Sequence, residues 1–497
     1  MRSALRRLPK GKAVGIDELP AELLKTDNEG TVKWLTRLCN TILATYTWPE
    51  DWLRSVFITI PKTPGTNECE EHRTIALICH TSKILLRILL QRQERLAEEQ
   101  YSEHQMGFRK NVGTRDQIFN LRMIVKKSRE FNIPLYFAFI DYKKAFDSLN
   151  HKKLWKVLKA MGIRAYAVKA LKSLYDNQEA AVRYEDELTD WFKIGRGSRQ
   201  GCLTSPMLFN LYSEKIMRES VDELNWIGLR ISGRNFNNLR FADDIVLIST
   251  SPIDLQRLID EVDRISTRYN LEISTKKTKV MAACREPEVL RISCRGKILE
   301  QVHHFKYLGA MVDETADCTR DIKARLGAAR SALSSLTKIW KDRALCKRIK
   351  LKVLKTLVWP VALYGCEAWT LKASDTNRLH AFEMACYRRL LRINWRDHRT
   401  NISVLEEINT TRQFVSTIRK RKLQYFGHVI RAQNISTHIL EGRVDGARGR
   451  GRPKRRWMDD VKDWTGETCA ACTAAARDRR LWRTMAHAAS IIPDPQP

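Results

Sequence analysis

The stretch Phe241-Ala242-Asp243-Asp244 decides the fold that we expect, because two adjacent acids stand between two apolar segments. Leu239-Arg240-Phe241 precedes the acids and Ile245-Val246-Leu247-Ile248 follows them. Apolar, β-branched flanks of this length predict two short strands, which places the acids at the tip of a tight hairpin. On its own, the tetrapeptide is more often a solvated turn than a metal site, so a second signal is needed.

A second apolar strand that ends on an acid lies upstream, where Tyr136-Phe137-Ala138-Phe139-Ile140 is followed directly by Asp141. If the two strands lie side by side, Asp141 comes close to Asp243 and Asp244. Three close carboxylates are stable only when a cation neutralises them. Their hard oxygen ligands favour Mg²⁺ or Mn²⁺ over zinc. The pattern therefore predicts a site for two such ions, the arrangement used for in-line phosphoryl displacement.

These segments and others around them resemble the reverse transcriptases of non-LTR (LINE-type) retrotransposons. Residues 141–147 look like the family's motif A, residues 197–210 like motif B and residues 241–244 like motif C. The other matching segments are residues 11–24, 72–77, 105–116, 271–279 and 305–309. The number and order of these segments make the resemblance specific, and it covers roughly the first 310 residues.

The resemblance implies a role for each acid. Asp141 and Asp243 would be the shared ligands of the two metal ions, and Asp244 would be a supporting acid near the primer terminus. Phe146, expected on the same element as Asp141, would lie under the sugar of the incoming nucleotide. An aromatic ring there would clash with a ribose 2′-hydroxyl, whereas an RNA-dependent RNA polymerase would need a polar residue. Phe146 therefore favours DNA synthesis.

The resemblance also assigns residues to the incoming nucleotide. Arg73 and Arg109 are candidates for gripping the triphosphate, because a guanidinium fork matches phosphate oxygens. Lys277 is a candidate for helping pyrophosphate to leave. Each of the three is also compatible with an ordinary surface cation. Gln200 completes this group of candidates.

The sequence of the motif B segment also predicts its local structure. We expect Gly197 and Gly201 to permit close backbone approach to template and nucleotide, and Thr204-Ser205-Pro206 to begin a helix with a cap and a proline at its first position. The alternative is an ordinary glycine turn before a core helix.

Composition agrees with partners that carry phosphate. Lys and Arg number 88 against 57 Asp and Glu, a net charge of +31, although ribosomal and membrane-surface proteins share this balance. Neither a membrane span nor a signal peptide is indicated, because no apolar run reaches eighteen residues. Twelve cysteines without a framework spacing indicate a reducing compartment. We expect the protein in the nucleus and cytoplasm, with template RNA, primer or target DNA and deoxynucleoside triphosphates as partners.

Residues beyond 310 have a different pattern. Apolar residues recur at helical spacing over 319–343, 348–363 and 378–395, as in a helical thumb or another helical bundle. Cys469 and Cys472 lack a second close pair, which favours free thiols over a degenerate zinc knuckle.

A basic, glycine-rich stretch covers residues 443–456. We expect this stretch to be mobile and to bind phosphate backbones, with nuclear localisation or a solvated linker as alternatives. Its candidate nucleic-acid-binding residues are Arg448, Arg450, Arg452, Lys454, Arg455 and Arg456.

The expected architecture is an α+β, right-hand polymerase. An N-terminal extension and fingers would occupy residues 1–125, a palm with an antiparallel sheet 126–310, a helical thumb 311–400 and a basic helical C-terminal region 401–497. The reverse transcriptase domain as a whole would span about 50–311.

The expected function is RNA-templated DNA synthesis, primed by a target DNA end. Because only ten residues precede the first matching segment, we expect the polypeptide to lack an endonuclease and not to nick its own target. The alternatives are an inactive element fragment that binds nucleic acid, favoured by the missing endonuclease, and an intron maturase, disfavoured by the LINE-like segments at both ends.

Overall fold

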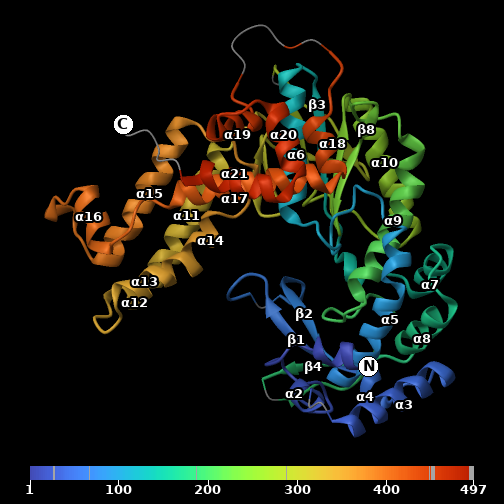
Figure 1. Ribbon diagram of the computed structural model, residues 1–497. Coiled ribbons are helices and arrows are strands. Elements are labelled where there is room, and N and C mark those ends of the chain that lie inside the picture. Colours follow the sequence, from blue (N-terminus) through green and yellow to red (C-terminus); the bar gives the residue numbers. More distant parts are fainter. Residues whose placement is uncertain are drawn as a thin grey trace.

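The computed structural model describes residues 1–25, 28–66, 68–185, 187–286, 288–446, 448 and 454–491. The described chain has the expected α+β parts, with two main sheets and a mainly helical second half (Figure 1). In the figure, the sheet with β1, β2 and β4 lies at one end of the molecule, away from the C-terminal helices α17 to α21.

The fingers are built around the first sheet, in which β1 (Arg54–Pro61) pairs antiparallel with β2 (His72–Leu77). On its other side β1 pairs in parallel with β4 (Glu179–Tyr184), and the short strands β5 (Glu187–Leu188) and β6 (Phe192–Lys193) pair with β4. Residues 179–193, which follow β3 in sequence, thus complete this sheet, and the domain boundary near residue 125 stays a prediction.

The palm sheet has the strand order β14, β11, β3, β10, β9. Its centre is β3 (Leu135–Ile140), which pairs antiparallel with β10 (Asp244–Ser249) and with β11 (Lys279–Ala283). The expected antiparallel arrangement holds except at one edge, where β14 (Glu300–Gln301) runs parallel to β11.

Both faces of the palm sheet are buried. Tyr136, Ala138 and Ile140 of β3 belong to one apolar core, and Phe137 and Phe139 belong to another. This alternation is the two-residue period of a strand, so each face of β3 has its own covering layer. An apolar run buried on both sides explains why β3 reads as continuously apolar in the sequence.

The two covering layers consist of helices. The first core contains α7 (His151–Ala160), α8 (Ala165–Asp176), α9 (Ser205–Ser220) and α10 (Pro252–Arg268). The second contains α6 (Thr114–Glu130). In Figure 1, α7, α8, α9 and α10 lie on one side of the molecule, and α6 lies among the C-terminal helices.

The thumb is helical, as predicted, and has a separate apolar core. In α11 (Thr319–Ser335) the residues Ile322, Leu326, Ala329 and Leu333 are buried at helical spacing. The chain continues through α13 (Lys347–Val353), a π-helical turn (Leu354–Val358), α14 (Trp359–Ala362) and α15 (Ala373–Leu391).

The C-terminal region is part of the main body. Residues of α17 (Phe414–Ala432), α19 (Trp457–Thr465), α20 (Cys469–Arg477) and α21 (Arg479–Ile491) share the second palm core with α6. The large side chains of Trp457 and Trp482 are almost fully buried there.

Described residues of the basic stretch 443–456 contact the rest of the protein. Val444 forms a bridge with Ile231, and Ser232 donates its backbone N–H to the carbonyl of Arg443 over 2.7 Å. Arg448 pairs with Glu130 at 2.9 Å. The expectation of a mobile stretch is therefore wrong for these residues, whereas Arg450 and Arg452 lie outside the described residues. Among the described helices, none is both long and apolar enough to cross a membrane.

Candidate active site

The two acids lie at the tip of a tight hairpin, as predicted. β9 (Asn238–Phe241) pairs with β10, and Phe241 lies opposite Asp244, so that Ala242 and Asp243 form the turn. Ala242 adopts a left-handed conformation, with φ of 58°. Such a conformation is uncommon outside glycine and asparagine, so the surrounding structure must hold this turn in place.

The third acid lies beside the hairpin because β10 is the neighbour of β3. Ile245 pairs with Ile140, and Asp141 directly follows Ile140. The predicted juxtaposition of Asp141 with the hairpin acids is therefore confirmed by the strand register.

The three carboxylates interact electrostatically. Desolvation, together with the charges of Asp243 and Asp141, raises the pKa of Asp244 to about 6, although part of the residue is exposed. Desolvation also raises the pKa of Asp243, and Asp141 adds to this effect. A site with raised carboxyl pKa values from mutual repulsion favours a bound cation.

Two cations oppose this repulsion. The Nζ atom of Lys277 lies 3.8 Å from Oδ1 of Asp141 and lowers the pKa of Asp141, against the larger effect of desolvation. Arg73, exposed on β2 of the fingers, lowers the pKa of Asp243. Two of the three predicted substrate-binding cations, Lys277 and Arg73, are therefore near the acids, and their contact with a nucleotide stays a prediction.

The side chains of Asp141, Asp243 and Asp244 are chemically suited to bind a hard divalent cation. All three side chains offer carboxylate oxygens, the ligands preferred by Mg²⁺ and Mn²⁺. In the part of the chain that the structure describes, no three His, Cys, Asp or Glu side chains are grouped closely enough to form a ready-made metal site.

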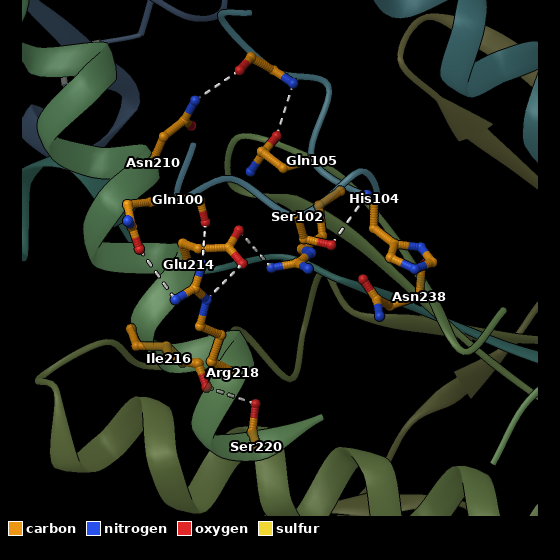
Figure 2. A network of polar contacts seen from close by, with 12 residues as sticks. Gln100, Ser102, His104, Gln105, Asn210, Glu214, Ile216, Arg218, Ser220 and Asn238 are labelled. Atoms are coloured by element: carbon orange, nitrogen blue, oxygen red, sulfur yellow. Dashed lines mark hydrogen bonds and ion pairs between the residues drawn. The ribbon is translucent and has the colours of Figure 1, made fainter. Parts of the chain in front are cut away.

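A buried network of hydrogen bonds and ion pairs, shown in Figure 2, connects the hairpin to neighbouring segments. The side-chain oxygen of Gln105 accepts hydrogen bonds from the backbone N–H groups of Gly107, at 2.7 Å, and Ala242, at 2.9 Å. Asn210 of α9 donates to the carbonyl of Gly107 over 2.8 Å. The turn is thereby tied to the loop 105–107 and to the helix of motif B.

The same network includes an ion pair between Arg240 and Glu214. Arg240 of β9 and Glu214 of α9 are both buried, and Nη1 of Arg240 lies 3.2 Å from Oε2 of Glu214. Figure 2 also shows Arg218 pairing with Glu214. Sequence reasoning did not identify Gln105, Asn210, Glu214 or Arg240 as site residues. The signals available were the motif segments 105–116 and 197–210, which contain Gln105 and Asn210, and the charged Arg240 within an apolar strand, because a buried charge needs a partner.

Phe146 does not lie on the same element as Asp141. β3 ends at Ile140, and Phe146 lies in a separate 3₁₀ turn (Ala145–Asp147) that begins after the left-handed residue Lys144. Its ring stacks on Phe209 of α9 with centroids 4.3 Å apart. Phe108 contacts it edge-on at 6.1 Å. The ring is therefore fixed by packing.

The two motif B glycines approach the protein's own backbone. At Gly197, with φ of 87°, a Cβ atom would lie 2.8 Å from the carbonyl oxygen of Asp147, and at Gly201, with φ of 104°, 3.1 Å from that of Ala76. Both positions thus require glycine for internal packing, and approach to template or nucleotide stays a prediction. Gln200 donates to the Asp147 carboxylate over 2.8 Å.

The predicted helix of motif B is present, with one difference at its start. Thr204 is the N-cap residue but makes no capping hydrogen bond through its side chain, and Ser205 is the first helical residue. Pro206 therefore occupies the second position of α9 instead of the first.

Arg109 is fully engaged inside the protein. It forms an ion pair with Glu98 at 2.5 Å and donates to the carbonyls of Ser102 and Gln105 over 2.9 and 2.7 Å. These contacts hold the loop that carries Gln105. A contact between Arg109 and a triphosphate stays a prediction, and it would require part of this set to break.

The candidate nucleic-acid-binding residues of the C-terminal region differ in whether they form ion pairs within the protein. Arg455 pairs with Asp460 and Asp463, and Arg456 pairs with Asp459. Lys454 is exposed and forms no ion pair with a described residue. Cys469 and Cys472 are free thiols, the first exposed and the second buried.

Comparison with known proteins adds a family match. Residues 60–312 match the family model described as "Reverse transcriptase (RNA-dependent DNA polymerase)". A transposon-derived protein of Caenorhabditis elegans is 31% identical over 51% of this chain and 96% of its own length. The RNA-directed DNA polymerase from mobile element jockey of Drosophila melanogaster is 23% identical over 80% of this chain and 44% of its own length.

A solved structure of Candida tropicalis telomerase, in complex with a fragment of telomeric RNA, is also similar. It aligns with a TM-score of 0.42 and 13% identity over 85% of this chain and 71% of the telomerase chain. The chain spans less than half the length of jockey and of several other transposon polymerases that it matches.

Proposed function

The chain belongs to the reverse transcriptase (RNA-dependent DNA polymerase) family, and on this basis we propose that it extends a DNA primer on an RNA template. The observation that carries the proposal is the pairing of β3 with β10, which brings Asp141 beside the hairpin acids Asp243 and Asp244. The relatives named as polymerases of non-LTR elements support the same element class for this chain, with target DNA as the primer.

The proposed reaction is a nucleotidyl transfer. The primer 3′-oxygen forms a bond to the α-phosphorus of a deoxynucleoside triphosphate, its proton leaves, and the bond from this phosphorus to the β-phosphate bridging oxygen breaks. Pyrophosphate departs. Lys277, beside Asp141, and Arg73, on the facing sheet, supply positive charge where phosphate charge develops.

The acids of the hairpin would hold the divalent cations. Asp141 and Asp243 are the proposed shared ligands, and Asp244 supports them. When bound, two Mg²⁺ or Mn²⁺ ions stabilise the charge on the attacking and leaving oxygens. The raised pKa values of the three acids support this assignment, because a cation offsets the desolvation that raises all three and the repulsion that adds to it at Asp243 and Asp244.

Phe146 is the proposed selector of deoxynucleotides. Its stacking on Phe209 and its edge contact with Phe108 leave the ring little freedom to move away from a ribose. A fixed ring discriminates by steric exclusion of the 2′-hydroxyl, in contrast to a flexible side chain.

The test is primer extension on poly(rA) with oligo(dT), dTTP and Mg²⁺. We expect extension by the natural protein and none by Asp243→Asn/Asp244→Asn. The matched control Glu187→Gln/Asp190→Asn removes two exposed acids from the fingers and should retain extension. If the natural protein is folded and binds the primer–template but does not extend it, a binding protein without polymerase activity replaces the proposal.

A further inference from the structure

A large basic cavity lies at the opposite end of the palm from the acids. It has a volume of about 1470 Å³ and is bounded by the end of α6, the end of β11, the start of the thumb, and residues 440–443, 448 and 454–458 of the C-terminal region. This volume exceeds the roughly 300–1,000 Å³ of typical small-molecule pockets. The cavity therefore has room for more than one small ligand.

The cavity is separate from the proposed active site. Tyr136 lines it, near the start of β3, whereas Asp141 follows the end of the same strand. Five residues of strand separate the two positions by about 17 Å. Ala283, at the cavity end of β11, pairs with Leu135, which gives the same orientation for the neighbouring strand.

The walls of the cavity carry excess positive charge. Among the described residues, ten lysines and arginines line it against five aspartates and glutamates. Of the five acids, Glu130 pairs with Arg448 and Asp317 with Lys372. Arg285, Arg443 and Lys454 are exposed and form no ion pair with a described residue.

Several cations are held in place by neutral groups. Lys127 donates to the carbonyl of Gly442 over 2.6 Å, and Arg129 donates to that of Cys284. Burial lowers the pKa of Lys127, and the charge of Arg448 acts in the same direction. Like charges held close together repel one another, which costs free energy. A bound anion would offset this repulsion.

One residue of the cavity wall carries a buried hydroxyl. Ser128 lines the cavity, is 0% exposed, and its Oγ atom has no hydrogen-bond partner among the described residues. Buried polar atoms are rarely left unsatisfied in folded proteins, so a missing partner at this position is informative.

We propose that this cavity is a second nucleic-acid site, which binds the phosphate backbone of a single-stranded RNA segment away from the primer terminus. The cavity size and the spread of cations over four parts of the chain fit an extended polyanion better than one small anion. The choice of RNA over DNA rests on the proposed function.

The first experiment measures RNA affinity. A fluorescein-labelled 12-nucleotide oligo(rU) is titrated against the natural protein and against Arg285→Glu/Arg443→Glu/Lys454→Glu, with fluorescence anisotropy as the readout. Loss of three phosphate contacts should flatten the slope of log K against log salt by about 2, since each contact to a single strand contributes about 0.7. The matched control Lys152→Glu/Lys156→Glu/Lys159→Glu, on α7, carries the same charge change and should keep the natural slope. Equal slopes for both triple variants would overturn the proposal.

The second experiment locates the RNA. Cys469 is exposed and lines the cavity, whereas Cys346 is exposed on the thumb. We expect oligo(rU) to slow alkylation of Cys469 by iodoacetamide, with the rate at Cys346 unchanged. Unchanged alkylation of Cys469 in the natural protein, which needs no variant to fold, would reject the site. Equal protection by inorganic pyrophosphate alone would mean a small-anion site and would also overturn the proposal.

This design separates the site from the polymerase activity. Asp243→Asn/Asp244→Asn should retain protection of Cys469, and the cavity variant should retain incorporation on a saturating hairpin-primed template. In the natural protein, protection of Cys469 without incorporation would contradict the proposed function alone, and incorporation without protection of Cys469 would contradict the second site alone.

Discussion

The side-chain oxygen of Gln105 accepts a hydrogen bond from the backbone N–H of Ala242, 2.9 Å away, across 137 residues of sequence. Ala242 is the left-handed residue of the turn that carries Asp243. The same oxygen accepts a hydrogen bond from the N–H of Gly107, so one side chain joins the loop 105–107 to the hairpin that carries Asp243 and Asp244.

Replacing Gln105 should impair catalysis more than binding. Gln105→Ala leaves two buried N–H groups without a partner, which costs about 1–3 kcal/mol each and frees the turn to relax. We expect kcat to fall by about tenfold or more while KM for the nucleotide changes little, measured by steady-state primer extension. Gln100→Ala, which removes an amide from the outer part of the network, is the control and should leave kcat within twofold. Equal losses in the two variants would contradict a positioning role for Gln105.

Removing the charge of Asp244 should stabilise the protein in a pH-dependent way. Its pKa is raised to about 6 in the folded state, so the ionised carboxylate costs stability above about pH 6, and the cost disappears as the pH falls toward 4. Asp244→Asn should therefore raise Tm by about 1–3 °C at pH 8 and leave it unchanged near pH 4, measured by thermal melting. Asp190→Asn, an exposed acid in the fingers, should show no such trend. A gain that is the same at both pH values would argue against repulsion among the acids.

Shortening Phe146 should relax sugar selection. Phe146→Ala removes the ring that stacks on Phe209, and we expect the ratio of kcat/KM for ribonucleotides to that for deoxynucleotides to rise by about 10–200-fold. Phe146→Tyr keeps the ring and should keep the natural ratio. Competition between dTTP and UTP on poly(rA) measures the ratio, and an unchanged value for Phe146→Ala would remove Phe146 from the nucleotide site.

Breaking one buried ion pair should loosen the C-terminal region from the polymerase. Lys422 of α17 and Asp460 of α19 are both 0% exposed and lie 2.5 Å apart. Lys422→Met leaves Asp460 with Arg455 as its remaining cation, and we expect a loss of about 3–5 kcal/mol in the free energy of unfolding by urea. Lys420→Met, an exposed neighbour on the same helix, should cost less than about 0.5 kcal/mol. A smaller loss for Lys422→Met/Asp460→Asn than the sum of the single variants would identify the pair as the cause.

Local patterns predicted much of the site. The apolar runs before Asp141 and around Asp243 identified both strands and the tight turn, because strand periodicity and turn chemistry are local properties of the chain. The helical spacing of Ile322, Leu326, Ala329 and Leu333 identified α11 for the same reason. The resemblance of the motifs predicted the family that the match over residues 60–312 then showed.

Other features could not be derived from such patterns. The parallel pairing of β4 with β1 makes the fingers discontinuous in sequence, and the packing of α17, α19, α20 and α21 against α6 makes the C-terminal region part of the palm core. Both depend on which apolar faces fit one another, a property of whole surfaces and not of residue order. Arg455 and Arg456 likewise looked like free cations until the fold supplied their acidic partners.

The amino-acid sequence by itself determined the chemistry of the site, the strands and turn that carry the three acids, and the family. Only the tertiary structure decided which side chains hold those acids in place and which cations of the basic cavity form no ion pair with a described residue. The physical reason is that a hydrogen bond such as that from Ala242 to Gln105, or an ion pair such as Lys422 with Asp460, requires two groups within about 3 Å, and residues far apart in sequence reach that distance only through packing.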